Sequence, residues 1–172
     1  MKKILAIILT IYLSIIIFMP KEQILYTALN QANSQNINFK IENPTDFGLF
    51  ENISKLNLLY DKDEVLEVTN AKLFPLLVYN RLSFSHINLV GSFKSMLDIK
   101  IIEAKLTQSI ISPTTLNIYA LSTIGEIEGS FNLKTDILKV VLTPNDKFKT
   151  FKYKEYFKKT KEGYVYESRI KY

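Results

Sequence analysis

The sequence predicts a mainly β protein with an N-terminal transmembrane helix, a short amphipathic helix and a curved antiparallel β-sheet meander shaped like half a barrel. Three observations support this fold class. Residues 4–19 carry no charge, the hydrophobic pattern changes to a period of two after residue 36, and the composition of 10 Tyr, 11 Phe and 5 Gly favours strands. We therefore expect an anchor over residues 1–20, a helix over residues 21–36 and one β domain over residues 37–172.

The N-terminal apolar run follows Lys2 and Lys3 and ends at Pro20. As a helix it would span about 24 Å, which is near the lower limit for crossing a bilayer. Bulky residues end the run where a signal peptidase needs small ones, and Pro20 suits the first turn of a new helix. We expect an uncleaved anchor; a cleaved signal peptide and the buried helix of a soluble protein are the alternatives.

The two N-terminal lysines also predict the orientation of this anchor. Basic residues stay on the cytoplasmic side of a membrane. We therefore expect a single-pass protein of the inner membrane, with a cytoplasmic N-terminus and a C-terminal domain in the periplasm of a Gram-negative cell.

Residues 21–33 have helical spacing. Their apolar residues share one face, which packs on the core or lies at the membrane surface. A polar turn over residues 33–36 ends the helix. The face comprises Ile24, Leu25, Ala28, Leu29 and Ala32.

Strands are expected where apolar and polar residues alternate. Pro75 makes residues 73–79 an edge strand or a short helical turn, and a change of phase at residues 87–91 indicates a bulge. Turns are expected at residues 43–46, 61–63, 135–136 and 143–146. The predicted strands cover residues 37–42, 53–60, 64–72, 82–86, 97–101, 116–120, 127–133, 137–142 and 163–167.

The alternation leaves one face of the sheet apolar. With few helices to cover it, the sheet must curl on itself or meet a partner, and a curled sheet makes a groove that suits acyl chains. The residues expected to line this groove are Leu116, Ile118, Ile127, Phe131 and Val140.

No motif for enzymatic chemistry is found. The absence of Cys excludes a thiol nucleophile, a disulfide framework and a Cys-ligated metal, and no cofactor is expected. His86 is the single histidine, so a structural role is favoured over a catalytic one. Residues 61–64 lack the spacing of a calcium loop and suit a solvated hairpin tip. Glu126 and Glu128 could do acid–base work, but a polar sheet face explains them equally.

Residues 147–161 form the one charge-biased segment, in which lysines alternate with Phe and Tyr. A short amphipathic helix with Phe148, Phe151 and Phe157 packed inward is the simplest interpretation. Contact with anionic lipid or a partner is the alternative, and nucleic acid is the least favoured. The lysines concerned are Lys147, Lys149, Lys152, Lys154, Lys158 and Lys159.

The order of these parts resembles the type II secretion protein N group and, more loosely, the AsmA-like envelope proteins. The resemblance rests on the apolar run followed by Pro20, on the strand Gly125-Glu126-Ile127-Glu128-Gly129 with the strand at residues 137–144 after it, and on the terminal Gly163-Tyr164-Val165-Tyr166. It implies a curved sheet in a non-enzymatic, membrane-anchored accessory subunit of an envelope machine. Such machines include type II secretion, type IV pilus and DNA-uptake systems.

Three functions follow as expectations. The first is an interaction subunit that docks on other parts of a secretion, pilus or DNA-uptake apparatus. The second is an AsmA-like module that binds or transports lipid in an apolar groove. The third, an enzyme built on Glu126 and Glu128, is the least supported. The identity of the machine, of the partner or lipid, and the oligomeric state are not determined by the sequence.

Overall fold

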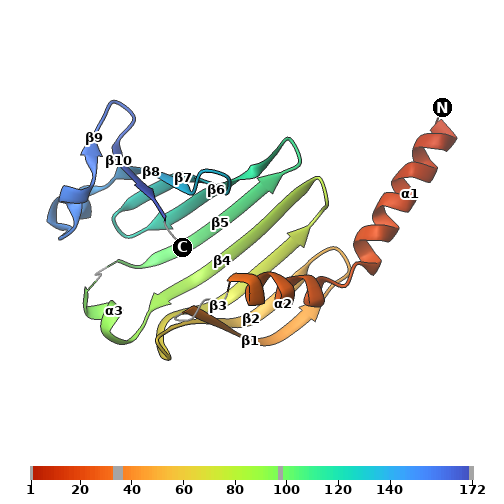
Figure 1. Ribbon diagram of the computed structural model, residues 1–172, viewed down its shortest axis with the longest axis horizontal. Coiled ribbons are helices and arrows are strands. Elements are labelled where there is room, and N and C mark those ends of the chain that lie inside the picture. Colours follow the sequence, from red (N-terminus) through yellow and green to blue (C-terminus); the bar gives the residue numbers. More distant parts are fainter. Residues whose placement is uncertain (1, 33–36, 97–98, 171–172) are drawn as a thin grey trace.

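The structure is a computed structural model that describes residues 2–32, 37–96 and 99–170 (Figure 1). Two helices come first, and a meander of strands follows. The elements are α1 (Lys2–Phe18), α2 (Lys21–Ala32), β1 (Ile37–Asp46), β2 (Glu51–Tyr60), β3 (Asp63–Pro75), β4 (Tyr79–Leu89), α3 (Gly91–Met96), β5 (Ile101–Ser109), β6 (Ser112–Ser122), β7 (Gly125–Asn132), β8 (Ile137–Pro144), the 3-10 helices η1 (Asp146–Thr150) and η2 (Lys154–Tyr156), β9 (Lys158–Lys159) and β10 (Tyr164–Arg169).

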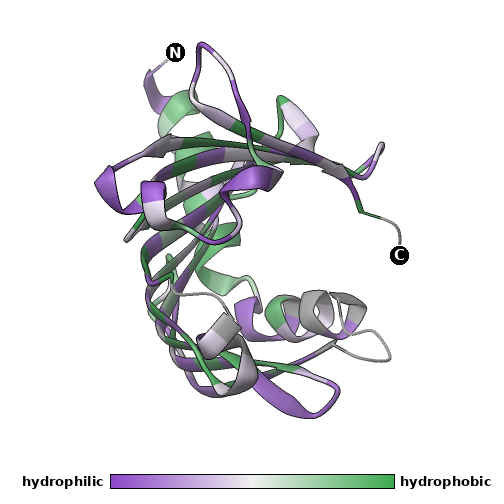
Figure 2. Ribbon diagram, turned by 90° about the vertical axis from the view of Figure 1, so that its left-hand side faces the viewer, coloured by the Kyte–Doolittle hydropathy of each residue, from purple (hydrophilic) through white to green (hydrophobic). Residues whose placement is uncertain are grey.

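One antiparallel sheet of 10 strands contains all of these strands, in the order β1-β2-β3-β4-β5-β6-β7-β8-β10-β9. Each strand from β1 to β7 pairs with the next one along the chain, and β10 lies between β8 and β9 and pairs with both. The sheet does not close, because β1 and β9 lie at its two ends. Figure 2 shows it bent into an arch, with α2 inside the curve. The mainly β, antiparallel meander is therefore confirmed.

Positive φ angles inside two strands mark places where the sheet bends. Asn43 in β1 has a φ of 51° and His86 in β4 has a φ of 55°. The regular pairs of β3 with β4 pass from Val68–Ile87 to Asn70–Ser85, so Thr69 and His86 are both left out and the register is unchanged. Irregular residues of this kind bend a strand and increase its twist. The bulge expected at residues 87–91 is wrong in place, since β4 pairs regularly from Ile87 to Leu89.

Helix α1 projects from one end of the arch and exposes most of its apolar side chains (Figure 1). Among the described helices, no single one is both long enough and apolar enough to cross a membrane. Lys2–Phe18 and Lys21–Thr27 meet both criteria only as a pair, with a bend of 60° between them. The transmembrane part of the predicted fold class therefore stays a prediction.

Helix α2 forms where the sequence predicted a helix. Of its expected apolar face, the structure describes the side chain of Leu25, which is buried. The side chains of Ile24, Ala28, Leu29 and Ala32, and the turn expected over residues 33–36, lie outside the described part of the chain.

Two predictions around prolines are wrong. The chain does not turn at residues 43–46, because β1 continues through Pro44 and reverses at residues 47–50. An edge strand tolerates the missing N–H donor of a proline. Residues 73–79 are neither an edge strand nor a helical turn: Pro75 ends the central strand β3, and the chain reverses over residues 76–78.

Two further segments differ from the predicted pattern. The strand expected over residues 97–101 begins later, as β5 at Ile101, and α3 precedes it; residues 97–98 are outside the described part. The amphipathic helix expected within residues 147–161 is instead the pair of short 3-10 helices η1 and η2, followed by β9.

Candidate functional site: the concave apolar face

The five residues predicted to line a groove lie on one face of the sheet. Leu116 pairs with Phe131 across β6 and β7, while Ile118 pairs with Gly129, which pairs in turn with Val140 on β8. Directly opposite residues of antiparallel strands point to the same face, as do residues two apart on one strand. The shared face therefore includes Leu116, Ile118, Ile127, Phe131 and Val140.

This face is the inner one of the arch. A series of direct pairs joins Ile127 to Ala120, Ala104, Phe84 and Ala71 across β7, β6, β5, β4 and β3. Ala71 belongs to the cluster that packs with Leu25 of α2. Because α2 lies inside the curve (Figure 2), the predicted groove residues lie on the concave face.

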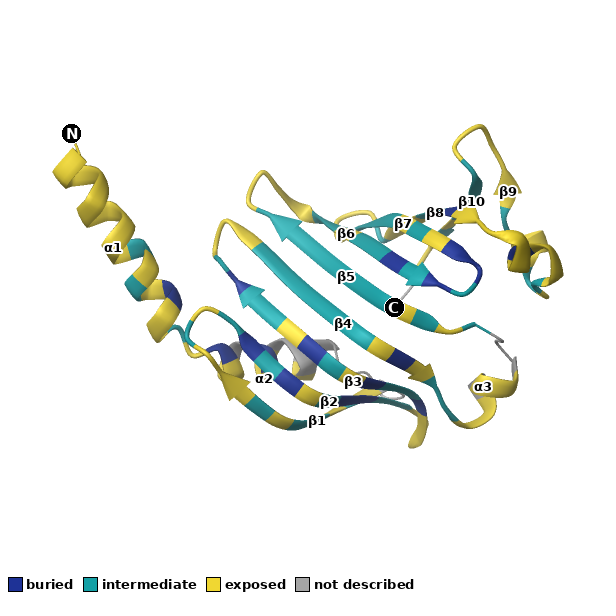
Figure 3. Ribbon diagram, turned by 180° about the vertical axis from the view of Figure 1, so that it is seen from behind, coloured by how far each residue is buried: buried dark blue, intermediate teal, exposed yellow. Residues whose placement is uncertain are grey.

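The concave face has two halves with different burial. The half on β1–β4, which we name the covered half, packs under α2. Five of its residues form one buried cluster with Leu25 of α2, and Ile53 is 0% exposed. Figure 3 shows these buried positions as bands across β2 and β3. The cluster comprises Leu25, Ile53, Leu56, Val68, Ala71 and Ile87.

No α-helix lies above the half on β5–β8, which we name the open half (Figure 2), although the 3-10 helix η1 packs Phe148 against one side of it. Most of its apolar side chains on this face are partly exposed, whereas Ala120 and Leu142 are buried. One row of direct pairs passes from Leu106 through Ile118 and Gly129 to Val140. The five predicted groove residues are all partly exposed.

Gly129 allows close approach of two strands within this row. A β-carbon at residue 129 would lie 2.7 Å from the carbonyl oxygen of Lys139 and 3.4 Å from Val140 Cγ2. The glycine therefore leaves the space above it between Ile118 and Val140 without a side chain. The row is therefore apolar, and its low point is Gly129, the position in its middle that has no side chain.

A second buried cluster closes one side of the open half. Phe148, at 4% exposure, packs with Ile124 and Leu142, and Ile127 lies against this cluster. The Phe148 ring lies 4.6 Å from that of Tyr164 and 6.0 Å from that of Phe157, in edge-to-face geometry. Ile127 therefore takes part in core packing, and four of the predicted residues remain beyond the cluster.

In the basic segment the phenylalanine side chains pack inward and the lysines face solvent, as predicted. Phe148 is buried and Phe151 and Phe157 are partly buried. All six lysines proposed for a membrane or partner contact are exposed. Those six are Lys147, Lys149, Lys152, Lys154, Lys158 and Lys159.

Local polar contacts hold this segment in place. The side chain of Asn145 accepts a hydrogen bond from the backbone N–H of Lys147 at 3.0 Å and donates one to the carbonyl of Thr123 at 3.0 Å. Lys149 forms an ion pair with Asp146 at 3.0 Å, and Lys154 donates to the Lys149 carbonyl at 3.0 Å. Some of the lysines thus have partners inside the segment.

The residues considered for catalysis lie apart from the concave face. Glu126 and Glu128 are exposed and pair with Leu121 and Tyr119, on the convex face. Residues 61–64 form the β2–β3 hairpin tip, as predicted, with Asp61 and Lys62 at positive φ. Within the described residues, no three His, Asp or Glu side chains are grouped so that they could hold a metal ion.

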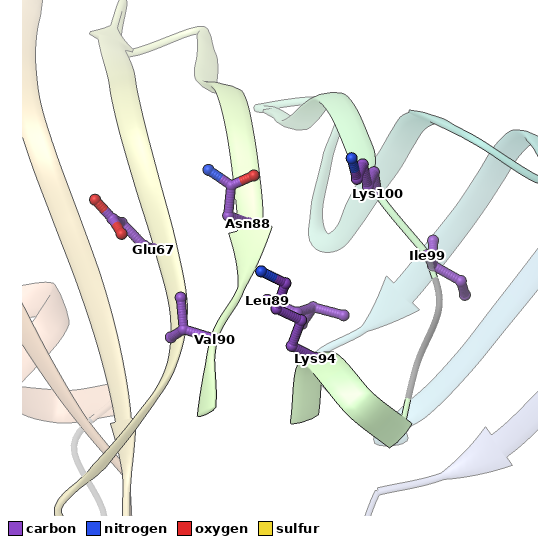
Figure 4. A pocket seen from close by; sticks show the side chains of 7 residues that line it. All are labelled: Glu67, Asn88, Leu89, Val90, Lys94, Ile99 and Lys100. Carbon is purple, nitrogen blue, oxygen red and sulfur yellow. The ribbon is translucent and has the colours of Figure 1, made fainter. Parts of the chain in front are cut away.

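A hollow of about 420 Å³ lies beside α3. Figure 4 shows Glu67 and Asn88 on neighbouring strands, with Lys94 and Lys100 on the other side of the opening. Glu67 already forms an ion pair with Lys55 at 3.5 Å. The lining combines charged, polar and apolar side chains, and it does not indicate a particular class of ligand.

A buried charged cluster at the α1–α2 elbow was not predicted from the sequence. Lys21 is 0% exposed and contacts Asp46 at 3.1 Å, while its amino group also donates to the carbonyls of Ile17 and Met19. Glu51, opposite Asp46, is 1% exposed, and its Oε2 has no hydrogen-bond partner. Burial raises the pKa of Glu51, and the nearby Glu22 and Asp46 carboxylates raise it further, while Lys21 opposes them.

Only the fold brings this cluster together, because Lys21 and Asp46 are 25 residues apart in the chain. The pair ties the helical elbow to the first hairpin of the sheet.

Comparison of the chain with protein-family models, with curated proteins and with solved structures gives no significant match.

Proposed function

We propose that this chain is a non-enzymatic, membrane-anchored binding module that holds the acyl chain of a lipid against the open half of its concave face. The observation that carries the proposal is the row of partly exposed apolar side chains across β5–β8, beside a covered half that contains a buried cluster. Each buried CH₂ of an acyl chain would gain about 0.8 kcal/mol. An apolar row with no side chain at Gly129 suits an unbranched chain.

The anchor in this proposal is α1. Its only charged residues are Lys2 and Lys3 at the start, and its apolar side chains are exposed along its length. A water-exposed surface of this size is unfavourable, and a bilayer would cover it. With the lysines cytoplasmic, the sheet lies in the periplasm next to the inner membrane. A C-terminal reporter enzyme that is active only after export tests this orientation, and activity in the cytoplasm would contradict it.

Lipid extraction tests the binding function directly. The full chain, purified from membranes in a mild detergent, should carry a co-purifying lipid that mass spectrometry detects. The double variant Ile118→Asp with Val140→Asp should lose that lipid. Val141→Asp is the matched control, because Val141 neighbours Val140 on β8 but points to the convex face. Equal lipid content in all three proteins, or none in any, would refute the proposal.

A second candidate, docking to another subunit, is favoured by one observation. The sheet is open, and β1, a strand of 10 residues, lies at its edge with β2 as its one neighbour in the sheet. An edge strand can pair with a strand from another protein. This fits the resemblance to type II secretion protein N, and the partner would be a subunit of a secretion, pilus or DNA-uptake apparatus.

Photo-crosslinking separates this candidate from lipid binding. A crosslinking residue at Lys40, exposed on β1, should give one discrete adduct with a second membrane protein in cells. The same residue at Lys139, exposed on the inner strand β8, is the control and should give none. If Lys40 gives no adduct, the docking candidate is wrong and the lipid proposal is unaffected.

A further inference from the structure

Three hairpin tips of the sheet carry exposed apolar residues at the same edge as α1. They join β1 to β2, β3 to β4 and β5 to β6, and the chain reverses there at residues 47–50, 76–78 and 110–111. We name these nine residues the tip edge. None of them is charged. The exposed ones include Phe47, Leu49, Leu77, Val78, Ile110 and Ile111.

The tips are joined to one another. The N–H of Ile110 donates to the carbonyl of Val78 at 3.0 Å, which links the second tip to the third. In the first tip Phe47 stacks on Phe50 at 5.0 Å, and Phe50 contacts Phe74 of β3 at 5.2 Å. The second and third tips are therefore joined directly, and the first tip contacts β3, the strand that leads into the second tip. Ile111 at 90% and Ile110 at 65% are among the most exposed hydrophobic residues of the described chain.

The opposite edge of the sheet has a different character. Its β2–β3 turn consists of Asp61 and Lys62, both exposed. Its β6–β7 turn holds Thr123 and a buried Ile124, so it presents little apolar surface. The fourth hairpin on the α1 side, between β7 and β8, carries an exposed Lys134. That fourth tip also exposes Leu133, but unlike the three tips nearest α1 it mixes the apolar residue with charge.

Helix α1 lies against the tip edge. The hydroxyl of Tyr12 donates a hydrogen bond to the carbonyl of Leu76, and Ile16 is 1% exposed. Gly48 lies beside Ile17, since a β-carbon there would be 3.9 Å from Ile17 Cγ2. Tyr12 is about 9 Å before Phe18 along the helix axis. A bilayer that covers α1 from its N-terminal end through Tyr12 therefore also reaches the second tip, where Leu76 lies.

We propose that the tip edge is a second membrane contact, seated in the bilayer beside α1. This inference rests on the proposed anchor. Apolar and aromatic residues without charge suit the boundary between headgroups and acyl chains. The contact would stand the sheet on the membrane with its strands rising from it. Leu116 and Phe131 lie on the tip side of Ile118, so the open half would begin at the bilayer surface and receive an acyl chain there.

Single-cysteine labelling tests the contact, because the natural chain has no Cys. An environment-sensitive fluorophore is placed at Leu77→Cys, Ile111→Cys, Lys62→Cys or Ile8→Cys in the full chain, reconstituted in phosphatidylethanolamine–phosphatidylglycerol vesicles. Ile111 and Lys62 are exposed, so these variants should fold. The position at Ile8 in α1 reports the anchor, and that at Lys62 reports the far edge.

The expected result is a severalfold rise in emission at residues 8, 77 and 111, quenched by spin-labelled lipid, with no quenching at residue 62. Quenching at residue 8 but not at residues 77 and 111 would overturn the membrane contact and leave the anchor intact. The absence of quenching at residue 8 would refute the anchor itself. Equal quenching at residues 62 and 111 would mean that the sheet lies flat, and would also overturn the proposed contact.

Discussion

The two halves of the concave face have the same strand pattern but different packing. The covered half buries Ile53 and Val68 beneath Leu25 of α2, whereas the open half leaves Ile118 and Val140 partly exposed. Both halves alternate apolar and polar residues and pair antiparallel, with a register shift between Leu58 and Leu59 in the covered half. The difference shows that one amphipathic sheet can form a buried core where a helix covers it and leave an apolar surface where none does; we propose that this surface binds lipid.

The largest expected effect separates the two halves by stability. Ile53→Ala should lower the free energy of unfolding by about 3 kcal/mol, because it leaves a cavity in a fully packed cluster. Ile118→Ala, the matched change in the open half, should cost at most about 1 kcal/mol since its side chain is already partly hydrated. Denaturant unfolding in mild detergent, followed by circular dichroism, measures both. Equal losses would show that the halves are packed alike.

Leu25→Asp should convert the covered half into an open one. A carboxylate cannot stay buried in the cluster, so α2 should leave the sheet at a cost of about 2 kcal/mol. The variant should bind an apolar dye such as ANS more strongly than the natural chain. Glu22→Asp, which keeps the charge of an exposed position on the same helix, is the control. Unchanged dye binding in the Leu25 variant would mean that α2 does not cover this half.

The pH dependence of stability should identify the buried carboxyl at the edge of the covered half. Folding raises the pKa of Glu51, so its contribution is most favourable below its unfolded pKa and is lost as pH rises through the folded pKa. Glu51→Gln should therefore unfold at higher denaturant concentration than the natural chain at pH 7. The difference should shrink as the pH falls toward 4. A difference that is independent of pH would contradict this account.

The smallest effect on stability is expected at the basic segment beside the open half. Lys158→Glu with Lys159→Glu changes two exposed residues and should alter stability by less than about 0.5 kcal/mol. Binding to vesicles that contain phosphatidylglycerol should weaken by about 1 kcal/mol per lysine removed if this segment meets the membrane. Lys139→Glu, on the convex face, is the control. Equal weakening in both would show that only net charge matters.

Much of the fold follows from local pattern. The period of two places Leu116, Ile118, Ile127, Phe131 and Val140 on one face, and the structure has them there. The burial of Phe148 and the exposure of the lysines around it also agree with the pattern. The turn at Asp61 and Lys62 lies where the two polar residues predicted it.

The errors occur where position in the sheet decides conformation. Pro44 was expected to end a strand, but at an edge its missing donor has little cost. The aromatic segment after Pro144 forms 3-10 turns instead of one helix, because Phe148 must reach Ile124 and Leu142. The buried contact of Lys21 with Asp46 joins segments that no local pattern relates.

The sequence by itself determined a first helix that is uncharged after Lys3, a β meander and the set of side chains on its apolar face. Each of these depends on the spacing of neighbouring residues, which local geometry translates directly into structure. Only the tertiary structure decided that α2 covers one half of the concave face and not the other. It alone also placed three apolar hairpin tips beside α1, because the bend and register of 10 strands determine which distant loops meet.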